Sequence, residues 1–67
     1  MPTWKARGFV IRLYEHDHPP LHVHVFRDGR LVARFDLENQ EFMTLRSPRQ
    51  RPSILRALRS AGVIGGK

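Results

Sequence analysis

The chain has 67 residues and no cysteine, so it forms one small domain at most, and no disulfide can stabilise it. No apolar run approaches the roughly 20 residues that cross a bilayer, and the N-terminus lacks the apolar stretch of a signal peptide, so we expect a cytoplasmic protein without membrane contact. Twelve Lys or Arg against six Asp or Glu give a formal net charge of +6, which favours an acidic partner such as RNA or DNA.

The first two-thirds of the chain alternate apolar and polar side chains, a pattern typical of strands. The segments with this pattern are about 8–15, 21–27 and 30–37, and the shorter segment 41–45 is compatible with a fourth strand. Proline cannot donate a hydrogen bond to a neighbouring strand, so Pro19-Pro20 excludes a strand between the first two segments. The dipeptide Asp28-Gly29 predicts a hairpin turn before the third.

The C-terminal part predicts a helix over about 48–61. Ser47 stands in the N-cap position with a proline after it, while Pro52 favours a regular helix that begins only near Arg51. Four apolar residues follow at helical spacing: Ile54, Leu55, Leu58 and Ala61. Gly62 is a candidate C-cap. We therefore expect an α+β fold, a three- to four-stranded antiparallel β-meander with one C-terminal α-helix packed on one face.

The register of the hairpin around Asp28-Gly29 decides which face of the sheet carries the histidines. A two-residue turn would place His24 opposite Ala33. A three-residue loop with a bulge would instead place Val25 opposite Ala33 and His24 opposite Arg34. The second register separates apolar from polar side chains more cleanly, so we predict it, with the two strand histidines on the polar face.

All four histidines of the chain, His16, His18, His22 and His24, lie within nine residues. One interpretation is a metal site. Zn²⁺ binds three or four nitrogen, sulfur or oxygen ligands in tetrahedral geometry. His22 and His24 leave the same face of one strand, and His16, His18 or a nearby aspartate would supply the remaining ligands. Zinc is the only cofactor that the sequence suggests.

Two other interpretations of the strand histidines stay open. A histidine moves protons near neutral pH, so His22 and His24 could act on a phosphodiester while Tyr14 and Arg34 stabilise the developing charge, as in a metal-independent ribonuclease. The alternative is purely structural, with both histidines hydrogen-bonded to their surroundings.

The positive charge is concentrated at the C-terminal end. Residues 1–41 hold six basic and six acidic side chains, whereas residues 42–67 hold six basic side chains and no acid. Five of these are arginines, which bind phosphate through two parallel hydrogen bonds. The candidate nucleic-acid-binding residues are therefore Arg46, Arg49, Arg51, Arg56 and Arg59. A solvated basic surface without a ligand is the alternative.

The segment Gly8–Tyr14, followed by Asp17-His18, the prolines and His22-x-His24-Val25, resembles a small bacterial domain-of-unknown-function family with an Asp-His-x-Pro-Pro-His-x-His-Val signature. The likeness covers roughly residues 8–58, and it departs from the family at Leu21, which stands where the second proline of the signature would be. Members of that family often occur in gene pairs suspected of being toxin–antitoxin modules. By position, the family's histidines correspond to His18, His22 and His24.

These observations lead to three functional hypotheses. The first is a small basic binding module, one component of a toxin–antitoxin-like pair, that contacts nucleic acid or a small cognate protein through the C-terminal arginines. The second is the histidine-dependent ribonuclease, and the third is the histidine-based metal-binding module. One short helix covers a sheet of this size thinly, so a homo-oligomer is also compatible with the sequence.

Overall fold

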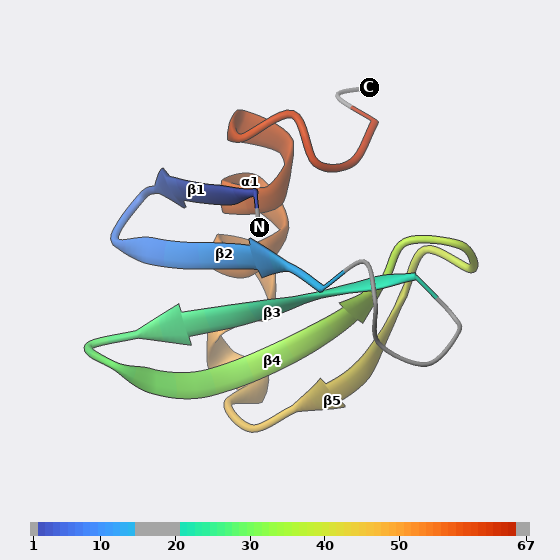
Figure 1. The fold of residues 1–67 in the computed structure, drawn as a ribbon. Coiled ribbons are helices and arrows are strands. Elements are labelled where there is room, and N and C mark those ends of the chain that lie inside the picture. The colour runs from blue at the N-terminus through green and yellow to red at the C-terminus, as the bar shows by residue number, and fades with distance from the viewer. Residues whose placement is uncertain (1, 15–20, 66–67) are drawn as a thin grey trace.

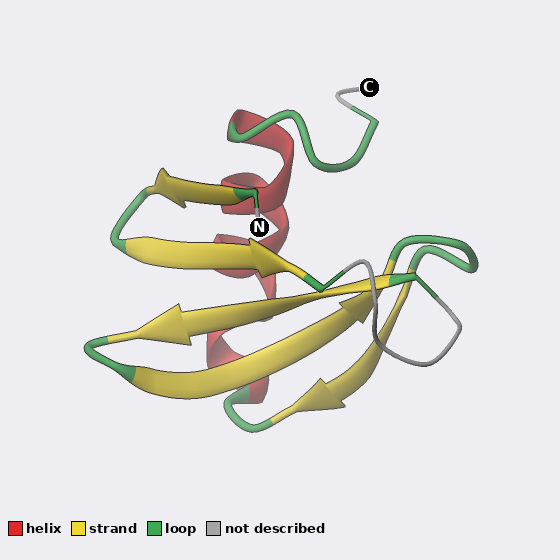
Figure 2. Cartoon of the chain, in the orientation of Figure 1, coloured by secondary structure: helices red, strands yellow, loops and turns green. Residues whose placement is uncertain are grey.

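The computed structural model describes residues 2–14 and 21–65, which form one antiparallel sheet and one helix (Figures 1 and 2). The strands are β1 (Thr3–Ala6), β2 (Phe9–Leu13), β3 (His22–Arg27), β4 (Arg30–Asp36) and β5 (Glu41–Leu45). A 3₁₀ turn, η1 (Pro48–Gln50), leads into the helix α1 (Arg51–Ser60). None of the helices in the described part of the chain is long and apolar enough to cross a bilayer.

The five strands lie in chain order, each antiparallel to the next. The α+β fold with a C-terminal helix is as predicted, but the sheet has five strands where three to four were expected. The missed strand is β1, which pairs with β2 so that Trp4 lies opposite Ile11. Its connection to β2 is the two-residue turn Arg7-Gly8, where both residues have positive φ (52° and 84°), as favoured hairpin turns require.

The β3–β4 pair has the predicted register over most of its length. Val25 lies opposite Ala33, and His24 lies opposite Arg34. Because successive side chains of a strand point to opposite faces, this register gives the sheet an apolar face and a polar face that carries the histidines.

The offset that produces this register lies within β4 and not in the turn. Leu31 and Ala33 pair with consecutive residues of β3, so Val32 is the extra residue of a β-bulge. The connection keeps two turn residues, Asp28-Gly29, both with positive φ (53° and 76°). The predicted three-residue loop is therefore wrong, although the faces it assigned to the side chains are correct.

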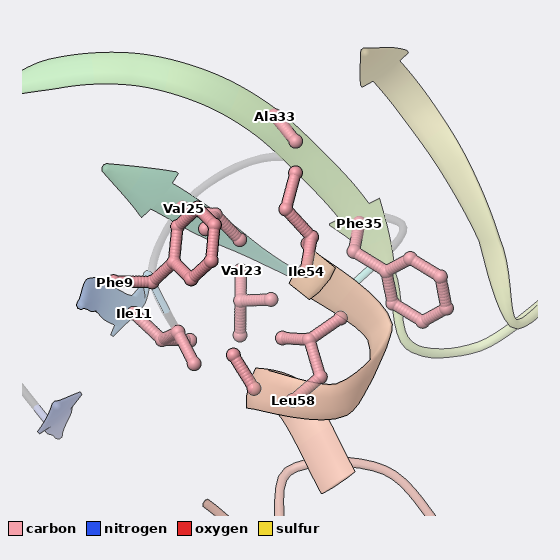
Figure 3. Close-up of a cluster of buried hydrophobic side chains, with 9 residues drawn as sticks. Phe9, Ile11, Val23, Val25, Ala33, Phe35, Ile54 and Leu58 are labelled. Carbon is pink, nitrogen blue, oxygen red and sulfur yellow. The ribbon is translucent and has the colours of Figure 1, made fainter. Parts of the chain in front are cut away.

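The core lies between the apolar face of the sheet and α1, which runs behind the sheet and across its strands (Figures 1 and 3). Nine buried residues make up this core: Phe9, Ile11, Val23, Val25, Ala33, Phe35, Ile54, Ala57 and Leu58. The opposite face of the sheet has no helix over it within the described part of the chain. Among the described residues, no further helix or strand thus lies over the polar face of the sheet or the outer side of α1.

The ends of α1 agree only partly with the sequence signals. The helix begins one residue before Pro52, as that proline predicts, and the preceding turn is 3₁₀. Ser47 stands in the N-cap position of η1 with Pro48 after it, as predicted, but its side chain makes no capping hydrogen bond. Gly62 has φ +75°, and the N–H of the next residue donates to the Leu58 carbonyl oxygen at 3.0 Å. This pattern is a Schellman motif and confirms Gly62 as the glycine that ends the helix.

Candidate functional site

The polar face of the sheet brings the predicted histidine-site residues together. His24 lies in the middle strand, with Arg12 opposite it on β2 and Arg34 opposite it on β4. The ring of Tyr14, which follows β2, lies 4.3 Å from the ring of His24, centroid to centroid. His22 is two residues from His24 on the same face and lies opposite Asp36.

The two strand histidines contact each other directly through their ring nitrogens. Nε2 of His22 and Nε2 of His24 are 3.2 Å apart, and the two rings are stacked with their centroids 5.1 Å apart. A hydrogen bond between these atoms requires one nitrogen to donate and the other to accept, so only one of the two Nε2 atoms then carries a hydrogen. His22 is only 4% exposed and His24 is half-buried, so both rings are held in place.

A row of rings continues from this pair along the sheet face. The Phe26 ring lies 6.3 Å from the His24 ring, and the Arg12 guanidinium lies 5.9 Å from the centre of the Phe26 ring. Arg12 is not among the predicted catalytic residues, although its alternation with the apolar residues of β2 already places it on the polar face. The row combines flat rings with one cation, a combination found where proteins stack nucleic-acid bases.

Arg34 and Asp36 of β4 are both engaged by neighbouring groups. Nη2 and Nε of Arg34 donate to Oγ1 of Thr44 on β5, at 3.0 and 3.3 Å. Oδ1 of Asp36 accepts the backbone N–H groups of Glu38 and Asn39, at 2.8 and 3.0 Å, and Oδ2 accepts the side-chain amide of Asn39 at 2.7 Å. The carboxylate of Asp36 therefore organises the turn between β4 and β5.

The same contacts set the ionisation of Asp36. The side-chain and backbone hydrogen bonds from Asn39 are the main cause that holds the pKa of Asp36 below its ordinary value of 3.8. Burial opposes this effect, while the Glu38 amide and the nearby His22 reinforce it. The carboxylate stays ionised beside the histidine pair at neutral pH.

The other two predicted metal ligands, His16 and His18, lie outside the described residues. Within residues 2–14 and 21–65, no three His, Cys, Asp or Glu side chains come together in a group that could hold a metal ion. The described part of the predicted zinc site is therefore the pair of His22 and His24.

Three of the predicted nucleic-acid-binding arginines, Arg51, Arg56 and Arg59, form a second surface on α1. All five, Arg46, Arg49, Arg51, Arg56 and Arg59, are exposed. Arg51, Arg56 and Arg59 line one shallow hollow on α1 together with Pro52 and Leu55. The guanidinium of Arg51 is also 5.7 Å from the Phe42 ring centre, a contact that orients it.

This arginine surface and the histidine pair lie on opposite sides of the fold. Ile54, Ala57 and Leu58 turn the inner side of α1 toward the sheet, and the hollow lined by Arg51, Arg56 and Arg59 lies on the exposed side of the helix. The histidines extend from the far face of the sheet.

A family model described as a domain of unknown function, DUF4160, matches residues 8–61 of the chain. No curated protein and no solved structure matches the chain. The match begins near β2 and includes all of α1, so it spans both surfaces described above.

Proposed function

The chain belongs to the family of the domain of unknown function DUF4160, and on that premise we propose that it is a small basic module that binds nucleic acid. Its binding surface is the outer side of α1. The observation that carries the proposal is the hollow lined by three arginines, Arg51, Arg56 and Arg59, in a region of the chain without a single acid.

The spacing of these arginines suits a phosphate backbone. Residues 51, 55 and 59 recur every fourth position and therefore lie along one side of the helix, with Arg51 and Arg59 about 12 Å apart along its axis. Arg56 borders the same hollow. Guanidinium groups in such a row can contact phosphates of one strand without reading the bases. We therefore expect affinity for RNA and DNA with little sequence preference from this surface.

The biological setting that we propose is a toxin–antitoxin-like pair, in which a small cognate protein accompanies this module. The resemblance of its histidine signature to members found in such gene pairs supports this part of the proposal. Co-purification of the neighbouring gene product with the chain tests it, and a neighbour that neither binds the chain nor alters its effect on growth would contradict it.

Fluorescence anisotropy with labelled single-stranded RNA and duplex DNA, measured at several salt concentrations, tests the nucleic-acid proposal. Binding is expected to weaken steeply with salt, because each phosphate contact releases a counterion. The variant Arg56→Gln/Arg59→Gln is expected to reduce the slope of log K against log salt concentration by about 2.

The matched control removes two charges elsewhere. Lys5 and Arg7 are exposed and lie in and just after β1, and Lys5→Gln/Arg7→Asn is expected to change the slope far less. Equal effects of the two double variants would mean that only the net charge matters. The absence of binding to both nucleic acids at low salt would overturn the proposal.

The ribonuclease alternative receives less support from the geometry. A general acid and a general base must each come within hydrogen-bond reach of the reacting phosphodiester. The Nε2 atoms of His22 and His24 instead contact each other at 3.2 Å, which leaves no room for a phosphate between them. This alternative expects growth inhibition on expression that His22→Ala or His24→Ala relieves, and toxicity unchanged by either substitution would exclude it.

A further inference from the structure

The histidine pair has a geometry that the nucleic-acid proposal does not use. His22 and His24 lie on the face of the sheet opposite to the arginine surface, and their Nε2 atoms converge to 3.2 Å. Two imidazoles can approach in this way for two reasons: to share a hydrogen, or to bind the same metal ion.

The distance fits a shared metal ion. Zinc binds imidazole nitrogen at about 2.0–2.1 Å in tetrahedral geometry, and two such nitrogens on one ion are therefore about 3.3 Å apart. The separation of the two Nε2 atoms is within about 0.1 Å of that value. We propose that His22 and His24 together bind one Zn²⁺ ion, or a chemically similar transition-metal ion, through their Nε2 atoms.

The surroundings hold the two rings ready for such an ion. His22 is buried, and the His24 ring is packed between the rings of His22 and Tyr14. Little side-chain freedom remains to be lost on binding, which lowers the entropic cost of the complex. Both histidines leave the strand in the same direction because they are two residues apart.

The imidazole ligands determine which type of metal ion binds, and the charged side chains around the pair affect how strongly it binds. Neutral imidazole nitrogens favour Zn²⁺, Cu²⁺ or Ni²⁺ and disfavour Ca²⁺ and Mg²⁺, which prefer oxygen. The ionised Asp36 lies opposite His22 and attracts a cation, whereas Arg12 and Arg34 lie opposite His24 and repel one. Two protein ligands leave further coordination positions for water or another donor.

The experiment uses the untagged full chain after treatment with a chelator, because an affinity tag of histidines would bind the same ions. Isothermal titration with ZnCl₂ near pH 7.5 is expected to show one ion per chain, and titration with CaCl₂ is expected to show none. His24→Gln is expected to weaken zinc binding at least tenfold. Lys5 lies on the same face of the sheet and has no proposed role in metal binding, so Lys5→Gln serves as the control. We expect this variant to bind zinc with unchanged or slightly higher affinity.

A second measurement does not depend on the folding of a variant. In the wild-type protein, stoichiometric Zn²⁺ is expected to shift the imidazole nitrogen resonances of His22 and His24 in long-range ¹H–¹⁵N NMR spectra. Absence of stoichiometric binding, equal zinc affinity of wild type and folded His24→Gln, or unshifted resonances of both histidines would overturn the proposal. The contact would then be an N–H···N hydrogen bond.

Discussion

Asn39 holds both carboxylate oxygens of Asp36: its backbone N–H donates to Oδ1 at 3.0 Å and its side-chain amide to Oδ2 at 2.7 Å. Asp36 ends β4, and the turn it organises leads directly into β5. Loss of the carboxylate therefore removes three hydrogen bonds that hold this turn, two from backbone N–H groups and one from the Asn39 side chain.

We predict that Asp36→Ala lowers the melting temperature more than Asn39→Ala does. The first substitution removes all three hydrogen bonds to the carboxylate, whereas the second removes only the bond from the side-chain amide. Thermal unfolding followed by circular dichroism measures both variants against wild type. Equal melting temperatures for wild type and Asp36→Ala would show that the turn forms without this carboxylate.

The same carboxylate is expected to make the fold sensitive to acid. The pKa of Asp36 lies below 3.8 in the folded protein, so the unfolded chain takes up this proton more readily than the folded one. The stabilisation is thus present above the ordinary pKa and is lost as the pH falls through the lower folded value. Urea unfolding in the presence of EDTA between about pH 5 and pH 2 measures it. Wild type should lose more stability over this range than Asp36→Asn, and parallel losses would contradict the prediction.

A single core truncation should remove most of the stability of a domain this small. Leu58 is fully buried between α1 and the sheet, and Leu→Ala changes at such positions cost about 2–5 kcal/mol. A domain of this size has only about 3–5 kcal/mol of net stability. We predict that Leu58→Ala is largely unfolded in urea concentrations that leave wild type folded.

Met43→Ala is the control, because Met43 is 41% exposed and its truncation should change the urea midpoint little. Similar midpoints for the two variants would mean that the described core does not govern stability.

The sequence also predicts that His16 and His18 contribute to the zinc site. His16→Ala/His18→Ala is therefore expected to weaken Zn²⁺ binding at least tenfold while the ¹H–¹⁵N shifts of His22 and His24 persist at saturating zinc. Titration calorimetry on the double variant measures the first effect. Unchanged affinity would limit the site to the strand pair and refute the role of the two preceding histidines.

The part of the fold that follows from side-chain polarity could be predicted from the sequence. Alternation along β3 and β4 was enough to pair His24 with Arg34, because the wrong register would have buried polar groups. The strand β1 escaped this reasoning, since in its four residues only Trp4 and Ala6 mark the apolar face. The N-cap position of Ser47 could also be predicted, whereas the absence of a capping hydrogen bond from its side chain could not.

The sequence was enough to predict which face of the sheet carries the site residues, but not which atoms of these residues contact each other. The spacing of His22 and His24 places them side by side on one face, yet the 3.2 Å between their Nε2 atoms depends on side-chain rotamers, which a sequence pattern does not specify. The hydrogen bonds from Arg34 to Thr44 depend on a second bulge, in the β4–β5 pair, where the pairing shifts after Arg34. Such bulges follow from packing over the whole sheet.

The chain-order arrangement of the strands has a consequence for how the protein folds. Each strand pairs only with the strand before or after it, so every hairpin can form by closing a short loop, at small entropic cost. The contacts of α1 with β1 and β2 are different, because they join the two ends of the chain. We expect rapid formation of local hairpins, with docking of α1 as the late step that links them into one cooperative unit.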